Sequence, residues 1–135
     1  MKLEIVKSMD HTIVHFEIPV ENVQKMRAFY ATLFGWKIER NPGSLEYWLI
    51  ETVPTDEQMT PLRPGVNGGM YQKPESEFKP VNYISVESID KYVEKTKALG
   101  GKILQPKQEV PGVGWVAIAL DPEGNQFAML QPMQT

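Results

Sequence analysis

The stretches IPVENVQKMRAFYATLFG (residues 18–35) and ISVESIDKYVEKTKALGG (residues 84–101) decide the fold, because the second repeats the first 66 positions later. The identical pairs are Ile18/Ile84, Val20/Val86, Glu21/Glu87, Lys25/Lys91, Leu33/Leu99 and Gly35/Gly101. Each copy is typical of a strand end, an amphipathic helix and a glycine stop. Two copies are too few for a solenoid. The repeat therefore predicts one domain built from two similar halves.

Outward from these helices, the pattern predicts the same order of elements in both halves. Strands are expected at 12–20, 36–40, 45–53 and 66–72, and again at 81–86, 102–105, 113–120 and 126–130. Asn22 and Ser88 are expected to cap the two helices. On the first helix the apolar face is expected to carry Phe29, and Phe34 is expected in the core with it. The halves are predicted to span about 10–73 and 81–132, with a linker at 74–80.

Composition excludes several classes of function. The chain has 135 residues, which suits one domain, and no cysteine, so it has neither disulfides nor zinc–sulfur sites. Its net charge of −3 is spread along the sequence, and this argues against nucleic acid as a partner. It has no apolar run of the roughly 18 residues that a membrane span needs. The expectation is a cytoplasmic protein that binds neither nucleic acid nor membrane.

The segment 53–65 is the main difference between the halves. Matching Asn67 to Asn125 gives the last strands an offset of 58, which assigns eight extra residues to the first half. A longer loop on a repeated scaffold is a candidate lid or rim of a binding site, or a tolerated surface insertion.

The whole pattern resembles the vicinal oxygen chelate superfamily of glyoxalases, bleomycin-resistance proteins and extradiol dioxygenases. The resemblance rests on the repeated βαβββ order, on Phe29-Tyr30 and Leu33-Phe34-Gly35-Trp36 at the first helix, and on the turn Asp121-Pro122-Glu123-Gly124-Asn125. It covers about residues 10–132. It implies an α+β fold of two tandem βαβββ modules whose curved mixed sheets enclose a cleft, and a homodimer.

In metal enzymes of that superfamily, four strand positions commonly supply His, Gln or Glu ligands. The resemblance places them at His15, Met70, Val81 and Ala128, so only His15 is a ligand. A shift of one residue from Met70 gives Gly69 or Tyr71, and neither is a carboxylate. No metal site is therefore expected, and no cofactor, although a divalent metal at an unusual site that includes His15 stays open.

The remaining candidates describe a pocket for a small-molecule ligand. Alternation places Glu17 on the same face of its strand as His15, and these two are the candidate catalytic residues. The candidate ligand-binding residues are Met70, Tyr83, Ser85, Gln126, Trp48 and Trp115.

Three hypotheses remain open. The first is a metal-free protein that binds an unknown small molecule. The second is a metal-free enzyme that uses His15 and Glu17 as acid and base. The third is a divalent-metal lyase, isomerase or dioxygenase of the same superfamily. Sequence alone leaves open whether the chain is an enzyme.

Overall fold

The chain folds into two compact units that share one topology. The computed structural model describes residues 9–43, 46–74 and 78–133. Backbone contacts define a first unit, Val14–Asn82, and a second unit made of Met1–Ile13 and Tyr83–Thr135. No helix in the described part of the chain is long and apolar enough to cross a membrane.

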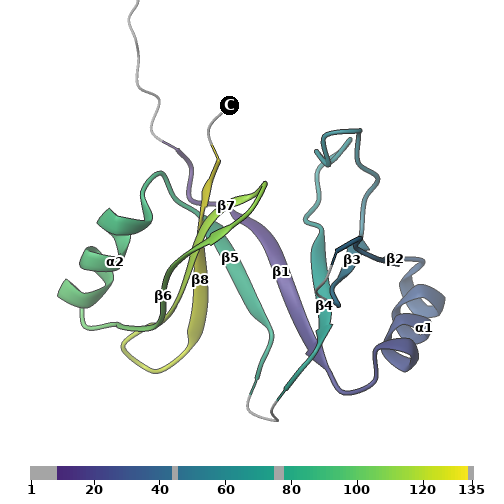
Figure 1. Cartoon of the computed structure of the whole chain (residues 1–135), viewed down its shortest axis with the longest axis horizontal. Helices are drawn as coiled ribbons and strands as arrows, with labels where there is room; N and C mark the ends of the chain where they lie inside the picture. The colour runs from purple at the N-terminus through teal and green to yellow at the C-terminus, as the bar shows by residue number, and fades with distance from the viewer. Residues whose placement is uncertain (1–8, 44–45, 75–77, 134–135) are drawn as a thin grey trace, which may run out of the picture. The chain divides into compact units, whose positions relative to one another are not determined.

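The first unit is a βαβββ module. Its elements are β1 (Ile13–Val20), α1 (Val23–Phe34), β2 (Lys37–Arg40), β3 (Trp48–Glu51) and β4 (Gly68–Gln72). Its strands lie in the order β2-β3-β4-β1, as Figure 1 shows, with β1 parallel to β4 and the other neighbours antiparallel.

The second unit repeats this arrangement. Its elements are β5 (Val81–Ser85), α2 (Ile89–Ala98), β6 (Lys102–Val110), β7 (Gly114–Leu120) and β8 (Gln126–Pro132). The strand order is β5-β8-β7-β6, and β5 and β8 are the parallel pair. The predicted α+β class and the tandem βαβββ modules are confirmed.

The helices begin where the sequence predicts. The side chains of Asn22 and Ser88 accept hydrogen bonds from the backbone N–H groups of Lys25 and Lys91, so each satisfies a donor in the first turn. Gly35 ends α1 with a φ of 74°, a left-handed conformation that glycine adopts at little cost.

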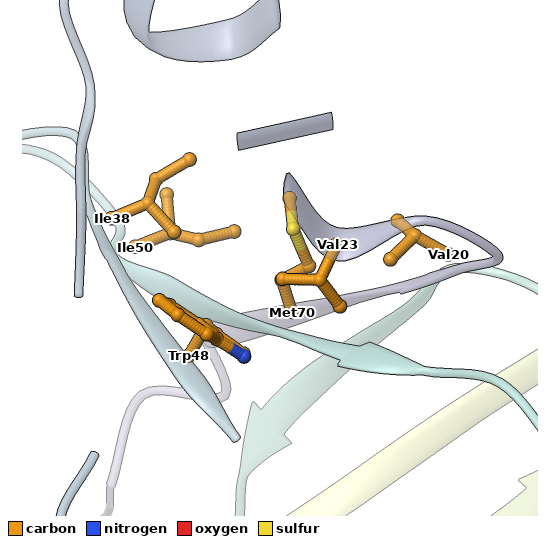
Figure 2. Close-up of a cluster of buried hydrophobic side chains, with 6 residues drawn as sticks. All are labelled: Val20, Val23, Ile38, Trp48, Ile50 and Met70. Carbon is orange, nitrogen blue, oxygen red and sulfur yellow. The ribbon is translucent and has the colours of Figure 1, made fainter. Parts of the chain in front are cut away.

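The core of the first unit lies between α1 and one face of its strands. Figure 2 shows its six buried side chains. They are Val20, Val23, Ile38, Trp48, Ile50 and Met70. Met70 is fully buried and pairs in register with Ile18. The sequence-based prediction put Met70 on the face that carries His15, and that facing is wrong: Met70 lies on the opposite face, as part of the core.

The core of the second unit lies under α2. It contains Val86, Ile89, Ala117 and Met129, with Trp115 packed against it from β7. Trp48 is thus a core residue of the first unit, and Trp115 is partly buried against the core of the second. In this unit Tyr83 and Ser85 are buried and pair with Ala128 and Leu130.

Helix α1 buries less of its apolar face than the sequence suggests. Val23 is buried, but Phe29 and Phe34 are 52% and 59% exposed, although both were expected in the core. The reason is geometric: the first turn of α1 packs on the sheet, and the last turn instead meets Trp36, to which Phe34 lies at 5.4 Å between ring centroids.

The segment between β3 and β4 is an ordered arm, which we define as residues 52–67. Figure 1 shows it extending beyond the strands that it joins. Asn67 closes its base, since its side-chain oxygen accepts hydrogen bonds from the backbone N–H groups of Thr52 and Val53 at 2.7 and 3.0 Å. Farther out, Thr55 and Pro61 form an isolated antiparallel bridge.

The tip of the arm copies the Asp121–Asn125 turn. In both turns an aspartate, Asp56 or Asp121, accepts backbone N–H hydrogen bonds from residues two and four positions later. In both, that aspartate's own N–H donates to the carbonyl four residues on. The position that Gly124 fills with a φ of 89° is filled in the arm by Met59 with a φ of 67°.

This match predicts a stabilising substitution. A left-handed conformation costs a residue with a side chain about 1–2 kcal/mol, partly offset by the greater chain entropy of an unfolded glycine. Met59→Gly is therefore expected to raise the free energy of unfolding by about 0.5–1 kcal/mol. Urea denaturation measures it, with Glu57→Gly, which lacks this strain, as the matched control. Equal effects of the two substitutions would contradict the explanation.

Strand β6 is longer than predicted. The sequence indicated a strand over 102–105, but pairing with β7 continues to Val110, with register shifts between Ile103 and Gln105 and between Gln105 and Gln108. These irregularities accommodate Pro106, which has no N–H to donate.

Candidate active site

A polar face covers the side of the first unit's strands away from α1. Its members follow from the register: Glu17 pairs with Gly69, and Gly69 pairs in turn with Leu49. Alternation along β1 and β4 adds His15 and Tyr71 to the same face. We call these residues, with Tyr47, the polar face. The predicted shared facing of His15 and Glu17 agrees with this register.

The centre of the polar face is a hydrogen-bonded chain of three side chains. His15 Nε2 lies 2.8 Å from the Tyr47 hydroxyl oxygen, and that hydroxyl donates to Glu17 Oε2 at 2.8 Å. The His15 and Tyr47 rings are nearly parallel, with an interplanar angle of 16°. The structure thus adds Tyr47, which the sequence analysis did not identify, between the two predicted residues.

This chain fixes the tautomer of His15. The Tyr47 hydroxyl has one proton, and it points to Glu17. The Tyr47 oxygen can then only accept from His15, so the imidazole carries its proton on Nε2. In the neutral ring the other nitrogen, Nδ1, is then the acceptor.

Burial keeps this imidazole neutral. Desolvation lowers the pKa of His15 below its ordinary value, and the negative charge of Glu17 opposes that change without cancelling it. The pKa of Tyr71 is raised, first by burial and second by the charge of Glu17, so this phenol keeps its proton. At neutral pH the polar face presents a proton acceptor beside two phenols.

The lowered pKa of His15 predicts acid sensitivity. As the pH falls below the unfolded-state value of 6.5, the unfolded chain binds a proton that the folded chain resists, so stability falls until the folded pKa is passed. His15→Gln should lose this part of the pH dependence, whereas His11→Gln should retain it. Urea denaturation between pH 5 and pH 8 measures it. Identical pH profiles for wild type and His15→Gln would refute the assignment.

The strand pairing also corrects the alignment of the two halves. Glu17 pairs with Gly69 and Tyr83 pairs with Ala128. The offset is therefore 66 between the first strands (83 minus 17) but 59 between the last strands (128 minus 69). The first half has seven extra residues (66 minus 59), not eight, and the equivalent of Ala128 is Gly69, not Met70.

These positions do not fit the superfamily's metal ion. The four ligand positions hold His15, Gly69, Val81 and Ala128, and only the first has a side chain that can donate to a metal. Within the described ranges, no group of three His, Cys, Asp or Glu side chains could hold a metal ion. Structural and catalytic zinc sites use three or more protein ligands. The donor set at the family's metal positions is therefore too poor for a divalent cation.

The other predicted site residues lie in the second unit. Tyr83, Ser85 and Gln126 share one face by register, opposite the face that packs on α2. Ser85 Oγ contacts the Met9 sulfur at 3.1 Å, and Gln126 is exposed.

The second unit contains a similar trio of side chains. His11 Nε2 lies 2.9 Å from the Tyr92 hydroxyl, which lies 3.4 Å from Glu87 Oε2. His11 Nδ1 is 2.9 Å from the Ser85 carbonyl, to which it can donate. Here the imidazole side chain is 41% exposed, and one of its nitrogens binds backbone. The trio ties the segment before β1 to α2, which is a structural role.

A separate pocket of about 360 Å³ lies between α1 and β2. Arg27, Trp36, Lys37 and Ile38 are among its lining residues, and the Arg27 Nε donates to the Ile38 carbonyl at 2.6 Å. None of the polar-face residues lines it.

The fold and the order of its elements place the chain in a known superfamily. The family model described as Glyoxalase/Bleomycin resistance protein/Dioxygenase superfamily matches residues 12–129. The chain therefore belongs to this superfamily, as the sequence resemblance predicted.

Individual relatives are distant. The chain is 27% identical over 111 residues to the protein named "Putative glyoxylase CFP32" of Mycobacterium tuberculosis, a match that takes in 78% of this chain and 40% of the relative. This chain thus spans less than half the length of that relative.

Two solved structures share the fold at low identity. A hypothetical protein from Bacillus halodurans superposes with a TM-score of 0.68 at 12% identity, covering 94% of this chain and 98% of the other. Methylmalonyl-CoA epimerase from Mycobacterium tuberculosis gives 0.66 at 9% identity, covering 97% and 94%.

Proposed function

We propose that this domain binds a small organic molecule on the polar face of its first unit, without a metal ion at the superfamily's ligand positions. The observation that carries the proposal is the chain His15–Tyr47–Glu17, which joins the one remaining ligand-type residue to a carboxylate through a phenol. In this proposal the His15 imidazole and the Tyr71 phenol recognise polar groups of the ligand, and Leu49 offers apolar contact.

A second candidate function, metal-free acid–base catalysis, is favoured by the protonation state of His15. A neutral imidazole can accept a proton from a carbon next to a ligand carbonyl. The electron pair of the broken C–H bond stays on the ligand as an enolate. The positive charge left on His15 is stabilised through Tyr47 by Glu17, much as a buried carboxylate stabilises the imidazolium of a catalytic triad.

Metal-dependent chemistry is the third candidate, since the superfamily includes dioxygenases. The poor donor set at the family positions argues against it. A direct test treats the protein with chelator and then adds Ni²⁺, Zn²⁺, Mn²⁺ or Fe²⁺. A stoichiometric metal whose removal abolishes ligand binding would establish this candidate and overturn the first proposal.

The ligand-binding proposal is tested by NMR titration of the metal-free protein with small carbonyl compounds and ring compounds. Ligands that bind should shift the resonances of His15 and of the β1 and β4 backbone. The His15→Ala substitution should weaken the binding of these ligands at least tenfold. Tyr92→Phe, in the second unit, is the matched control and should leave binding unchanged. Ligands that shift only second-unit resonances would overturn the proposed location.

Deuterium exchange separates binding from catalysis. If His15 removes a proton from a bound carbonyl compound, that compound should incorporate deuterium from D₂O in the presence of the wild-type protein and not with His15→Gln. Binding without exchange supports the binding function alone.

The cytoplasmic location and the homodimer stay predictions from the sequence.

A further inference from the structure

We propose that Tyr47 is a positioning residue that takes the space of a metal ligand at position 69, between His15 and Glu17, and that Gly69 is the residue that admits it. The inference deepens the proposed function, on which it rests for its biological meaning. Its geometry and its test need no ligand.

The position of Tyr47 depends on the missing side chain of Gly69. A Cβ atom added to Gly69 would overlap the Tyr47 ring, with the hydroxyl oxygen as its nearest neighbour and Cζ next. Gly69 stands between Glu17 on β1 and Leu49 on β3. The Tyr47 side chain, which starts just before β3, therefore crosses β4 over the bare backbone of Gly69 to reach β1.

The adjacent glycine serves the opposite face. A Cβ added to Gly68 would meet the Phe16 carbonyl oxygen and ring, which belong to the core side. The pair Gly68-Gly69 thus admits a close contact on each face of β4. Only the contact at Gly69 involves the polar face.

A side chain at position 69 and the phenol of Tyr47 exclude each other. Position 69 is the structural equivalent of Ala128, one of the superfamily's ligand positions. A carboxylate there, as in the metal enzymes, would occupy the space that the Tyr47 hydroxyl uses. Either a metal ligand or this tyrosine can be present, and the chain has the tyrosine.

The phenol does part of what a metal ion would do. It holds His15 Nε2 at 2.8 Å and fixes its ring orientation. Unlike a cation, the Tyr47 hydroxyl also donates a hydrogen bond to Glu17. Tyr47 itself need not touch the ligand.

Nitrogen-15 NMR of the histidine side chains tests this positioning. In the wild type, neutral His15 should show a protonated Nε2 and an unprotonated Nδ1. Tyr47→Phe should weaken this preference and shift the tautomer equilibrium, because it removes the acceptor that Tyr47 offers to Nε2. Gly69→Ala should produce the same change although Tyr47 is still present, since the added Cβ displaces the ring.

Two controls separate positioning from general destabilisation. Gly112→Ala, at a left-handed glycine with open space around it, should leave the His15 signals unchanged. Tyr71→Phe removes a phenol from the same face and should also preserve the tautomer. A wild-type His15 signature in either Tyr47→Phe or Gly69→Ala would overturn the proposal.

A gain-of-function variant tests the exclusion of metal. Tyr47→Ala combined with Gly69→Glu places a second carboxylate beside His15 and Glu17 and removes the blocking phenol. Calorimetric titration with Zn²⁺ or Ni²⁺ should show at least tenfold tighter binding than either single variant. Binding no tighter than that of Tyr47→Ala alone would overturn the metal-replacement part.

The results separate this inference from the function that it deepens. If Tyr47→Phe changes the tautomer preference of His15 while ligand binding stays intact, the result supports Tyr47 as the positioning residue. An unchanged tautomer overturns the inference but leaves ligand binding on the polar face to its own titration.

Discussion

Met70→Ala should lower the free energy of unfolding by about 2–5 kcal/mol, the usual cost of truncating a fully buried methionine. Met70 is completely buried among Val20, Val23 and Trp48, and the loss of three heavy atoms leaves a cavity that β4 cannot close without shifting against β1. Urea denaturation followed by tryptophan fluorescence measures the change.

Met133→Ala is the matched control for this prediction. Met133 is partly exposed near the end of the described chain, and its truncation should change stability by no more than about 0.5 kcal/mol. The comparison also tests the facing of β4. A Met70→Ala variant with wild-type stability and weakened ligand binding would return Met70 to the pocket and contradict its place in the core.

Asn67→Ala should cost about 2–4 kcal/mol and loosen the arm. The Asn67 side chain accepts from two backbone N–H groups and from the Thr52 hydroxyl, and donates to the Val53 carbonyl at 3.1 Å. Its loss strips partly buried backbone groups of their partners, which costs more than the net value of the bonds themselves. Hydrogen exchange should show lost protection in residues 52–67.

Asn67→Asp provides the graded control. Aspartate keeps the acceptor for the Thr52 and Val53 N–H groups but cannot donate to the Val53 carbonyl, so its cost should be clearly smaller than that of Asn67→Ala. If both variants lose the same stability, the accepted backbone bonds are not what closes the arm. If Asn67→Ala leaves hydrogen exchange in the arm unchanged, the hydrogen bonds by which Asn67 closes the arm are not formed in solution.

Local signals in the sequence predicted the helices and their ends, and the resemblance to the superfamily supplied the fold. Helix caps at Asn22 and Ser88 and the glycine stop at Gly35 involve neighbours within four residues, so composition and spacing reveal them. The repeat then predicted the same order of strands along the chain in both halves. Pairing between distant strands is different, because a one-residue error turns every side chain to the other face.

That error occurred once, at Met70. The asparagines Asn67 and Asn125 were matched as equivalents, but they have different roles: Asn67 closes the arm, and Asn125 binds Asp121 within its turn. The actual equivalence, of Gly69 with Ala128, can be read only from the ladder. The residue types agree with this equivalence, since the apolar Met70 suits the core and Gly69 leaves room for a neighbouring side chain.

Tyr47 was missed for a related reason. Its role depends on a pairing 30 residues away in sequence, with Glu17, and on the glycine between them. Successive side chains of a strand point to opposite faces. If Trp48 had been recognised as a core residue, Tyr47 would have been predicted on the face away from the core. The candidate acid–base pair could be predicted from one strand, but the group that links it could not.

The irregular strand β6 has a consequence for self-association. It is the last strand in the second unit's order, and an edge of nine residues would normally invite another chain to add a strand. Pro106 interrupts the row of donors, the register shifts kink the strand, and Lys102 and Lys107 place positive charges along it. Such an edge is a poor template for fibril growth. Solutions of the protein should therefore stay clear at concentrations where a protein with a flat edge strand of the same length would aggregate.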